Sequence, residues 1–234
     1  MTTANSTSVD SNKIAKRSGK SSFTSTEADS DLDLLLWRLQ ARTKSNPDLG
    51  AMFGLTSCGA KSGVTTLAAN LSARAANSSM GPVLLIDANI STPRLHRMFR
   101  MGGKPGLVDL LIGSSTPEEC IKNSGVEELD ILPVGSKEAI QTGRVLPDSY
   151  AEVTSWIRER YRTIFIDLPT IEEMRHSLFL ARLTDITIVA VRSEGPRRSS
   201  VASSVQGLVD DGVNIGGTVL TRRRVYTPRW LRND

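Results

Sequence analysis

The chain has 234 residues and a formal net charge of +4, and 39% of its residues are hydrophobic. This length fits one domain with a core of ordinary depth, and two cysteines are too few for a disulfide framework or a four-thiolate zinc site. No apolar run approaches the roughly 20 residues that span a bilayer and no hydrophobic signal segment opens the sequence, so we expect a soluble, cytoplasmic protein.

The two ends of the chain differ in composition from the part between them. The first 26 residues include 12 serines and threonines and almost no large apolar side chains, which predicts a flexible tail over 1–26. Residues 222–234 carry five arginines and are interpreted as a basic C-terminal tail. Such a tail could approach acidic lipid headgroups, although charge alone favours a solvated end. The folded domain is therefore expected at 27–221.

Helices and strands alternate along this domain. Four leucines follow the i, i+3, i+4, i+7 spacing of one helix face: Leu32, Leu35, Leu36 and Leu39. The sequence then predicts strands at 51–55, 83–87, 129–132, 163–167, 186–191 and 215–220, and helices at 67–76, 148–161, 174–183 and 197–211. Because the strands are largely apolar and are separated by helices, we expect a parallel sheet that helices cover on both faces. The predicted fold class is α/β, in a single three-layer domain.

A loop rich in small residues lies between the first predicted strand and the helix that follows it. It reads TSCGAKSGVTT at 56–66. Because it opens a helix, its N–H groups can surround an anion at the positive end of the helix dipole. The residues expected around that anion are Gly59, Ala60, Lys61, Ser62, Gly63, Val64, Thr65 and Thr66.

Two aspartates end buried strands near this loop. Asp87 closes VLLID and Asp167 closes TIFID. A carboxylate at a strand tip that faces a phosphate loop is how Mg²⁺ is held, through water and a hydroxyl such as that of Thr65. Each feature alone has an ordinary explanation, since a glycine can serve a turn and an aspartate can cap a helix. The combination of loop and two aspartates predicts a Mg²⁺ and phosphate site.

Two long stretches carry a resemblance to a known family. They read GLTSCGAKSGVTTLAANLS at 54–72 and GPVLLIDANISTPRLHRMFRMGGKPGLVDLLIG at 81–113. Together with ERYRTIFIDLPT at 159–170, they resemble the bacterial tyrosine kinases (BY-kinases), which are partners of polysaccharide co-polymerases and are related to ParA/MinD-type ATPases. The resemblance extends from about residue 27 to residue 230.

The resemblance implies a P-loop NTPase fold of the ParA/MinD/BY-kinase type, with ATP or ADP and Mg²⁺ as ligands. It implies that Asp87 and Asp167 act in catalysis if the protein is active, and that the protein serves exopolysaccharide biosynthesis or export. Its partner would be a membrane polysaccharide co-polymerase on a separate chain, which would place the protein at the inner face of the cell membrane. Self-association stays open, and nucleic acid is not expected as a partner.

Position 64 departs from the pattern of the family. Val64 stands where the Walker A lysine belongs, while Gly63 and Thr65 keep their places. Valine has no cation to span the β- and γ-phosphates, so nucleotide binding should be lost or weakened roughly 10- to 100-fold. Lys61 lies three residues earlier and is an alternative source of charge, although a solvated side chain is favoured there.

Other landmarks of the family are eroded as well. Asn89 stands in place of the second acid of the Walker A′ stretch, and Ser91 in place of the basic residue that follows. The glutamate and two arginines that help members build a ring of subunits are only in part present, as Glu27 is followed by Ser30 and Asp33. The tyrosine cluster that members phosphorylate is missing, and Tyr226 is the one candidate near the C-terminus.

Three hypotheses follow, and whether the protein is an enzyme stays open among them. The favoured one is a pseudokinase that regulates a polysaccharide co-polymerase by contact. The second is an active ATPase or autokinase in which Lys61 replaces the lost lysine, so that Lys61→Ala would abolish nucleotide binding. The third is a ParA/MinD-like positioning ATPase. Gly59 stands where that class has its signature lysine, which argues against this hypothesis, and salt-dependent DNA binding would support it.

Overall fold

The structure, a computed structural model, describes residues 25–43, 49–78, 81–138, 147–193, 195 and 197–221. Most of the predicted N-terminal tail, the whole predicted C-terminal tail and Tyr226 lie outside the described residues. The first helix begins at Ser25, within the last residues of the segment predicted as a tail.

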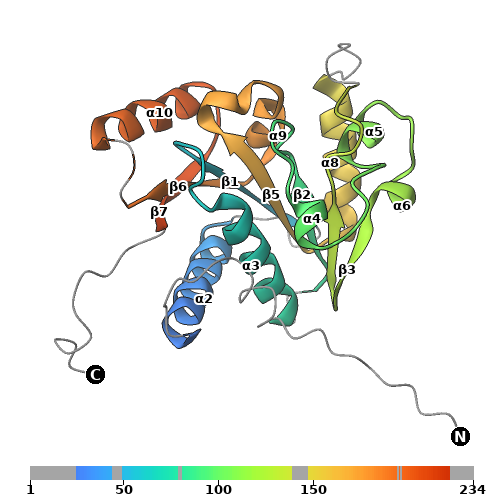
Figure 1. Ribbon diagram of the computed structural model, residues 1–234, viewed down its shortest axis with the longest axis horizontal. Helices are drawn as coiled ribbons and strands as arrows, with labels where there is room; N and C mark the ends of the chain where they lie inside the picture. The colour runs from blue at the N-terminus through green and yellow to red at the C-terminus, as the bar shows by residue number, and fades with distance from the viewer. Residues whose placement is uncertain are drawn as a thin grey trace, which may run out of the picture.

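A seven-stranded sheet forms the centre of the fold (Figure 1). Its strands lie in the order β3-β4-β2-β5-β1-β6-β7, and every neighbouring pair is parallel except β3 with β4. The strands are β1 (Ala51–Ser57), β2 (Val83–Asp87), β3 (Lys122–Val126), β4 (Leu129–Leu132), β5 (Thr163–Thr170), β6 (Ile186–Arg192) and β7 (Ile215–Thr221). The central strands β2, β5 and β1 are buried along almost their whole length, because both of their faces are covered.

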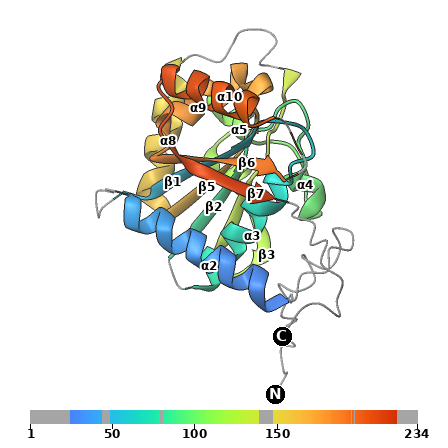
Figure 2. The same cartoon turned by 90° about the vertical axis from the view of Figure 1, so that its left-hand side faces the viewer.

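Helices cover the sheet on two faces (Figure 2). One face carries α2 (Ser25–Arg42) and α3 (Val64–Asn77), and the other carries α8 (Pro147–Arg160), α9 (Leu178–Leu183) and α10 (Arg198–Asp210). Shorter elements are α4 (Leu95–Met98), α5 (Leu107–Leu111), α6 (Pro117–Cys120) and the 3₁₀ helix η1 (Ile171–His176). This arrangement confirms the predicted three-layer α/β domain. Among the described helices, none combines the length and the apolar character that a membrane span requires.

The leucines predicted on one face of the first helix attach α2 to the body of the domain. Leu36 and Leu39 are each 3% exposed and belong to the hydrophobic cluster between the sheet, α2 and α3. Beside them, Asp33 receives two hydrogen bonds from the guanidinium of Arg74 on α3. Helix α2 is therefore fixed to α3, the helix that begins at the small-residue loop.

The sequence missed several short elements and misplaced some boundaries. The edge strand β3 reads KNSGV and has no apolar alternation, so no strand was predicted there. The helix predicted at 174–183 is divided at Ser177, whose hydroxyl donates to the carbonyl oxygen of Ala88 (2.8 Å). Helix α3 begins at Val64, three residues before the predicted start, and β5 runs on to Thr170.

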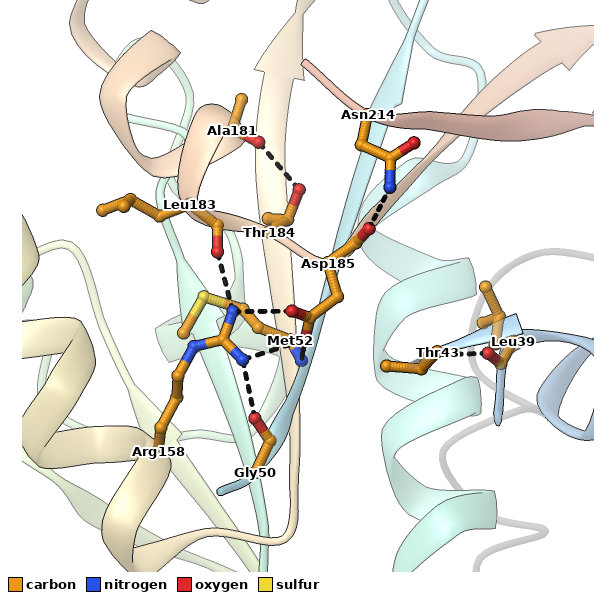
Figure 3. Close-up of polar contacts among 10 residues, drawn as sticks. All are labelled: Leu39, Thr43, Gly50, Met52, Arg158, Ala181, Leu183, Thr184, Asp185 and Asn214. Atoms are coloured by element: carbon orange, nitrogen blue, oxygen red, sulfur yellow. Dashed lines mark hydrogen bonds and ion pairs between the residues drawn. The ribbon is translucent and has the colours of Figure 1, made fainter. Parts of the chain in front are cut away.

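A polar network joins the amino-terminal ends of β1 and β6 to α8 (Figure 3). The Arg158 guanidinium forms a bidentate ion pair with Asp185 (2.9 and 3.1 Å) and donates to the carbonyl oxygens of Gly50 (2.8 Å) and Leu183 (2.8 Å). The Asp185 carboxylate also accepts the N–H of Met52 (2.7 Å). This network therefore fixes α8 to β1, the strand that leads into the small-residue loop, and to its neighbour β6.

Candidate functional site

The loop between β1 and α3 lies at the carboxyl edge of the sheet, where ligands of α/β proteins bind. The Ser62 hydroxyl donates to the carbonyl oxygen of Gly59 (2.5 Å), and the Thr221 hydroxyl donates to the carbonyl oxygen of Ser62 (2.6 Å). Two loop residues have a left-handed backbone, Lys61 (φ 60°) and Gly63 (φ 83°). The carbonyl groups of Gly59 and Ser62 are thus paired within the protein.

The start of α3 supplies the N–H groups that an anion requires. The first N–H to bond back along the helix is that of Leu67, to the carbonyl oxygen of Gly63 (2.9 Å), so the N–H groups of 64–66 have no partner within the helix. Within the part of the chain that the structure describes, no side chain caps this end, and a Cβ placed on Gly59 would meet no atom within 4 Å. A 14-residue helix with an uncapped positive end in the described structure, preceded by a loop with open space at Gly59, fits a phosphate group.

The two positions considered for a phosphate-binding cation have different surroundings. Val64 is 8% exposed and packs into the hydrophobic cluster beneath α2 and α3. Lys61 is exposed and forms no hydrogen bond or ion pair with any residue of the described ranges. Position 64 is therefore apolar in surroundings as well as in side chain, and no contact holds the Lys61 ammonium over the loop.

Asp87 ends β2 and lies side by side with Asp167 in the adjacent strand β5, three residues before the end of that strand. Their residues are 0% and 1% exposed, respectively. One Asp87 oxygen accepts the N–H groups of Arg94 (3.0 Å) and Leu95 (3.1 Å), and its other oxygen accepts the N–H of Asn89 (3.2 Å). In contrast, neither oxygen of Asp167 has a hydrogen-bond partner among the described residues.

The burial of this pair shifts both of its pKa values upward. Burial raises the pKa of Asp87 to about 6, although its three backbone hydrogen bonds act in the opposite direction. The pKa of Asp167 lies well above its ordinary value because of burial and because of the negative charge on Asp87. The Thr65 hydroxyl and the Arg94 guanidinium lower it in part. Two carboxylates in one buried place cannot both ionise easily without a cation.

The oxygen atoms gathered here fit a Mg²⁺ ion. Asp167 offers two buried oxygens without a partner, Asp87 lies beside it, and the Thr65 hydroxyl is close enough to influence the Asp167 carboxylate. Mg²⁺ prefers such oxygen ligands and usually binds through one or two carboxylates together with phosphate and water. No group of three or more His, Cys, Asp or Glu side chains occurs in the described part of the chain that would complete an all-protein cage. The ion would therefore need a phosphate and water to fill its coordination.

Arg94 is a residue of this site that the sequence did not reveal. Its N–H holds the Asp87 carboxylate, and its guanidinium acts on Asp167 by charge. A backbone contact leaves no trace in side-chain patterns, which is why it was missed. The predicted residues 59–66, Asp87 and Asp167 all lie at this one edge of the sheet, as parallel topology requires.

Cys58 does not have the surroundings of a redox-sensitive thiol. A nearby helix N-terminus by itself lowers the pKa of a thiol, but at Cys58 other effects outweigh it. Burial raises the pKa of Cys58, and the charge of Glu172 raises it further. The residue is therefore a small side chain that fits the turn.

The chain is similar to known tyrosine kinases in sequence and to kinase domains and MinD in fold. No protein-family model matches the chain. The chain is 24% identical over 166 residues to the tyrosine-protein kinase Wzc of Salmonella typhi, a match that covers 71% of this chain and 23% of Wzc. It is 26% identical over 168 residues to CapB of Staphylococcus aureus, which covers 72% of this chain and 73% of CapB. The chain thus spans about a quarter of the length of Wzc and most of the length of CapB.

Solved structures give the same fold. The kinase domain of the Escherichia coli tyrosine kinase ETK superimposes with a TM-score of 0.76 at 21% identity, over 86% of this chain and 79% of that domain. The septum site-determining protein MinD of Pyrococcus horikoshii, solved in complex with Mg-ADP, gives a TM-score of 0.57 at 24% identity, over 73% of this chain and 70% of MinD. At these levels of identity, both similarities show a shared fold.

Proposed function

This chain is a homologue of the bacterial tyrosine kinases with their P-loop fold, and we propose that it regulates exopolysaccharide biosynthesis or export as a degenerate member of that family. The proposed protein is a pseudokinase that acts by contact. It binds a Mg-nucleotide weakly or not at all, and its regulatory surface rather than phosphoryl transfer carries the function.

The observation that carries this proposal is the contrast between the two halves of the site. The Mg²⁺ half has Thr65, Asp87 and Asp167, and the two Asp167 oxygens have no hydrogen-bond partner among the described residues. The phosphate half keeps the loop and the helix N-terminus but has Val64, buried in the core, at the position of the lysine. Mg²⁺, when bound, would neutralise phosphate charge, whereas the loop and the start of α3 would orient the phosphates through their N–H groups, without a lysine.

The partner proposed for this chain is a membrane polysaccharide co-polymerase on a separate chain. The resemblance of 81–113 to the exopolysaccharide kinases supports this partner rather than a DNA-bound one. Such a partner would hold the protein at the cytoplasmic face of the membrane. The basic segment at 222–234 would add charge attraction to acidic lipids.

The alternatives are an active autokinase and a MinD-like ATPase. The autokinase needs a cation in the phosphate half, and Lys61, which is exposed and forms no hydrogen bond or ion pair with the described residues, is a weak source for it. The MinD-like reading draws on the fold similarity, but position 59 carries glycine and not the lysine which that class uses.

A complementation experiment tests the proposal. In a strain that lacks the gene, the natural chain and its Asp167→Asn variant should restore exopolysaccharide output equally, because contact and not catalysis is required. Neither should acquire phosphotyrosine when incubated with Mg-ATP. An Asp167→Asn variant that behaves like the deletion, together with phosphotyrosine on the natural chain, would instead establish the active autokinase.

A further inference from the structure

We infer that Arg94 supplies the cation that faces the phosphate end of this site, in place of the lysine missing at position 64. The inference deepens the proposed function and rests on its nucleotide site. It assigns residual Mg-nucleotide binding to a residue on the segment after β2, and not to the phosphate loop.

The backbone of Arg94 is fixed at the Mg²⁺ half of the site. Its N–H donates to the Asp87 carboxylate (3.0 Å), and the next N–H, from Leu95, donates to the same oxygen (3.1 Å). Leu95 is 0% exposed and anchors this segment in the core. The side chain of Arg94 therefore starts next to a carboxylate that would hold the metal, at the carboxyl edge where the phosphates would lie.

The guanidinium itself is available. Arg94 is exposed, and its side chain forms no hydrogen bond or ion pair with the described residues. Its charge nevertheless lowers the pKa of Asp167, which lies in the neighbouring strand. By comparison, the side chain of Arg97 on the same segment donates to the His96 ring (3.3 Å).

An arginine suits this task chemically. The guanidinium is always charged and can donate two parallel hydrogen bonds to one phosphate. Because Arg94 starts beside the two aspartates that would hold Mg²⁺, its charge should act on the metal-bound end of a nucleotide more than on the α-phosphate. Arg94 should therefore favour ATP over ADP, and ADP over AMP.

Calorimetric titration of Mg-ATP, Mg-ADP and AMP into the purified full chain tests this assignment. The variants are Arg94→Ala, Arg94→Lys, Lys61→Ala and, as a control with the same loss of charge three residues away, Arg97→Ala. We expect Arg94→Ala to weaken Mg-ATP binding roughly 10- to 100-fold, with a smaller effect on Mg-ADP and none on AMP. Arg94→Lys should recover part of the loss, and Arg97→Ala and Lys61→Ala should stay within about twofold of the natural chain.

Three results would overturn the assignment. The first is an Arg94→Ala variant that binds Mg-ATP as well as or better than the natural chain, which would mean that Arg94 only neutralises the two aspartates. The second is an equal loss in the Arg97→Ala control. The third is a natural chain that binds no Mg-ATP at all, since then Arg94 does not replace the lysine. In that third case, binding by Val64→Lys would still support the proposed nucleotide site, whereas its failure to bind would reject the site as well.

Discussion

Asp167→Asn should make the metal-free protein more stable at pH 8, by about 1–3 kcal/mol. The substitution removes a buried negative charge that has no hydrogen-bond partner among the described residues and that raises the cost of ionising its neighbour. Asparagine keeps the size of the side chain and is neutral. Urea unfolding of both proteins in EDTA measures the difference, and Asp31→Asn, which removes one exposed carboxylate, is the control.

The pH dependence of the same pair has a definite sign. Because the pKa of Asp87 rises from 3.8 to about 6 on folding, the native state binds a proton more tightly than the unfolded state. The resulting stability is fully present below pH 3.8 and is lost as pH rises through about 6. The metal-free natural protein should thus gain stability from Asp87 as pH falls from about 6 towards 3.8, and Mg²⁺ should compensate at the higher pH. If the natural protein matches Asp167→Asn in stability across this range, with or without Mg²⁺, then the two buried aspartates do not destabilise the metal-free protein.

Arg158→Ala should cost about 2–3 kcal/mol of unfolding free energy, at the lower end for a buried ion pair because both side chains keep some solvent contact. The side chains of Arg158 and Asp185 are 18% and 28% exposed. Truncation leaves the Asp185 carboxylate without its cation and two carbonyl oxygens, of Gly50 and Leu183, without their donor. For a domain of this size the melting temperature should fall by roughly 5–10 °C.

Arg160→Ala is the matched control for that experiment. Arg160 lies on the same helix, stacks over Trp156 at 4.0 Å and pairs with Glu159 only at 3.6 Å. Its removal should change stability by no more than about 1 kcal/mol. Equal melting temperatures for the two variants would show that the network at the amino-terminal ends of β1 and β6 does not hold the sheet together.

The central strands of the sheet could be predicted from the sequence because their hydrophobic pattern is pronounced. Strands such as VLLID and TIFID are apolar on both faces, which occurs where helices cover a parallel sheet on two sides. The same topology brought Asp87 and Asp167 together, since adjacent parallel strands end at one edge. These features depend on local composition and on chain order, which a sequence displays directly.

The features that escaped prediction depend on contacts between distant parts of the chain. The edge strand β3 is polar and forms because β4 lies beside it, and Ser177 divides a helix to reach Ala88. Arg94 enters the site through its backbone N–H and the position of its charge. The burial of Val64 likewise follows from how α3 packs on the sheet and not from the loop's own residues.

Calorimetric titration of Mg-ATP into the natural chain and into Val64→Lys tests the central claim most directly. The claim is that the site has its Mg²⁺ ligands and its phosphate loop, and that its affinity for nucleotide is low because the Walker A lysine is missing. We predict that Val64→Lys binds roughly 10- to 100-fold more tightly than the natural chain, while Val64→Met, which adds length without charge, shows no gain. Thermal melting of each variant verifies that the substitution at this buried position leaves the protein folded. A natural chain that already binds Mg-ATP as tightly as Val64→Lys would contradict the claim, because the valine would then not have weakened the site.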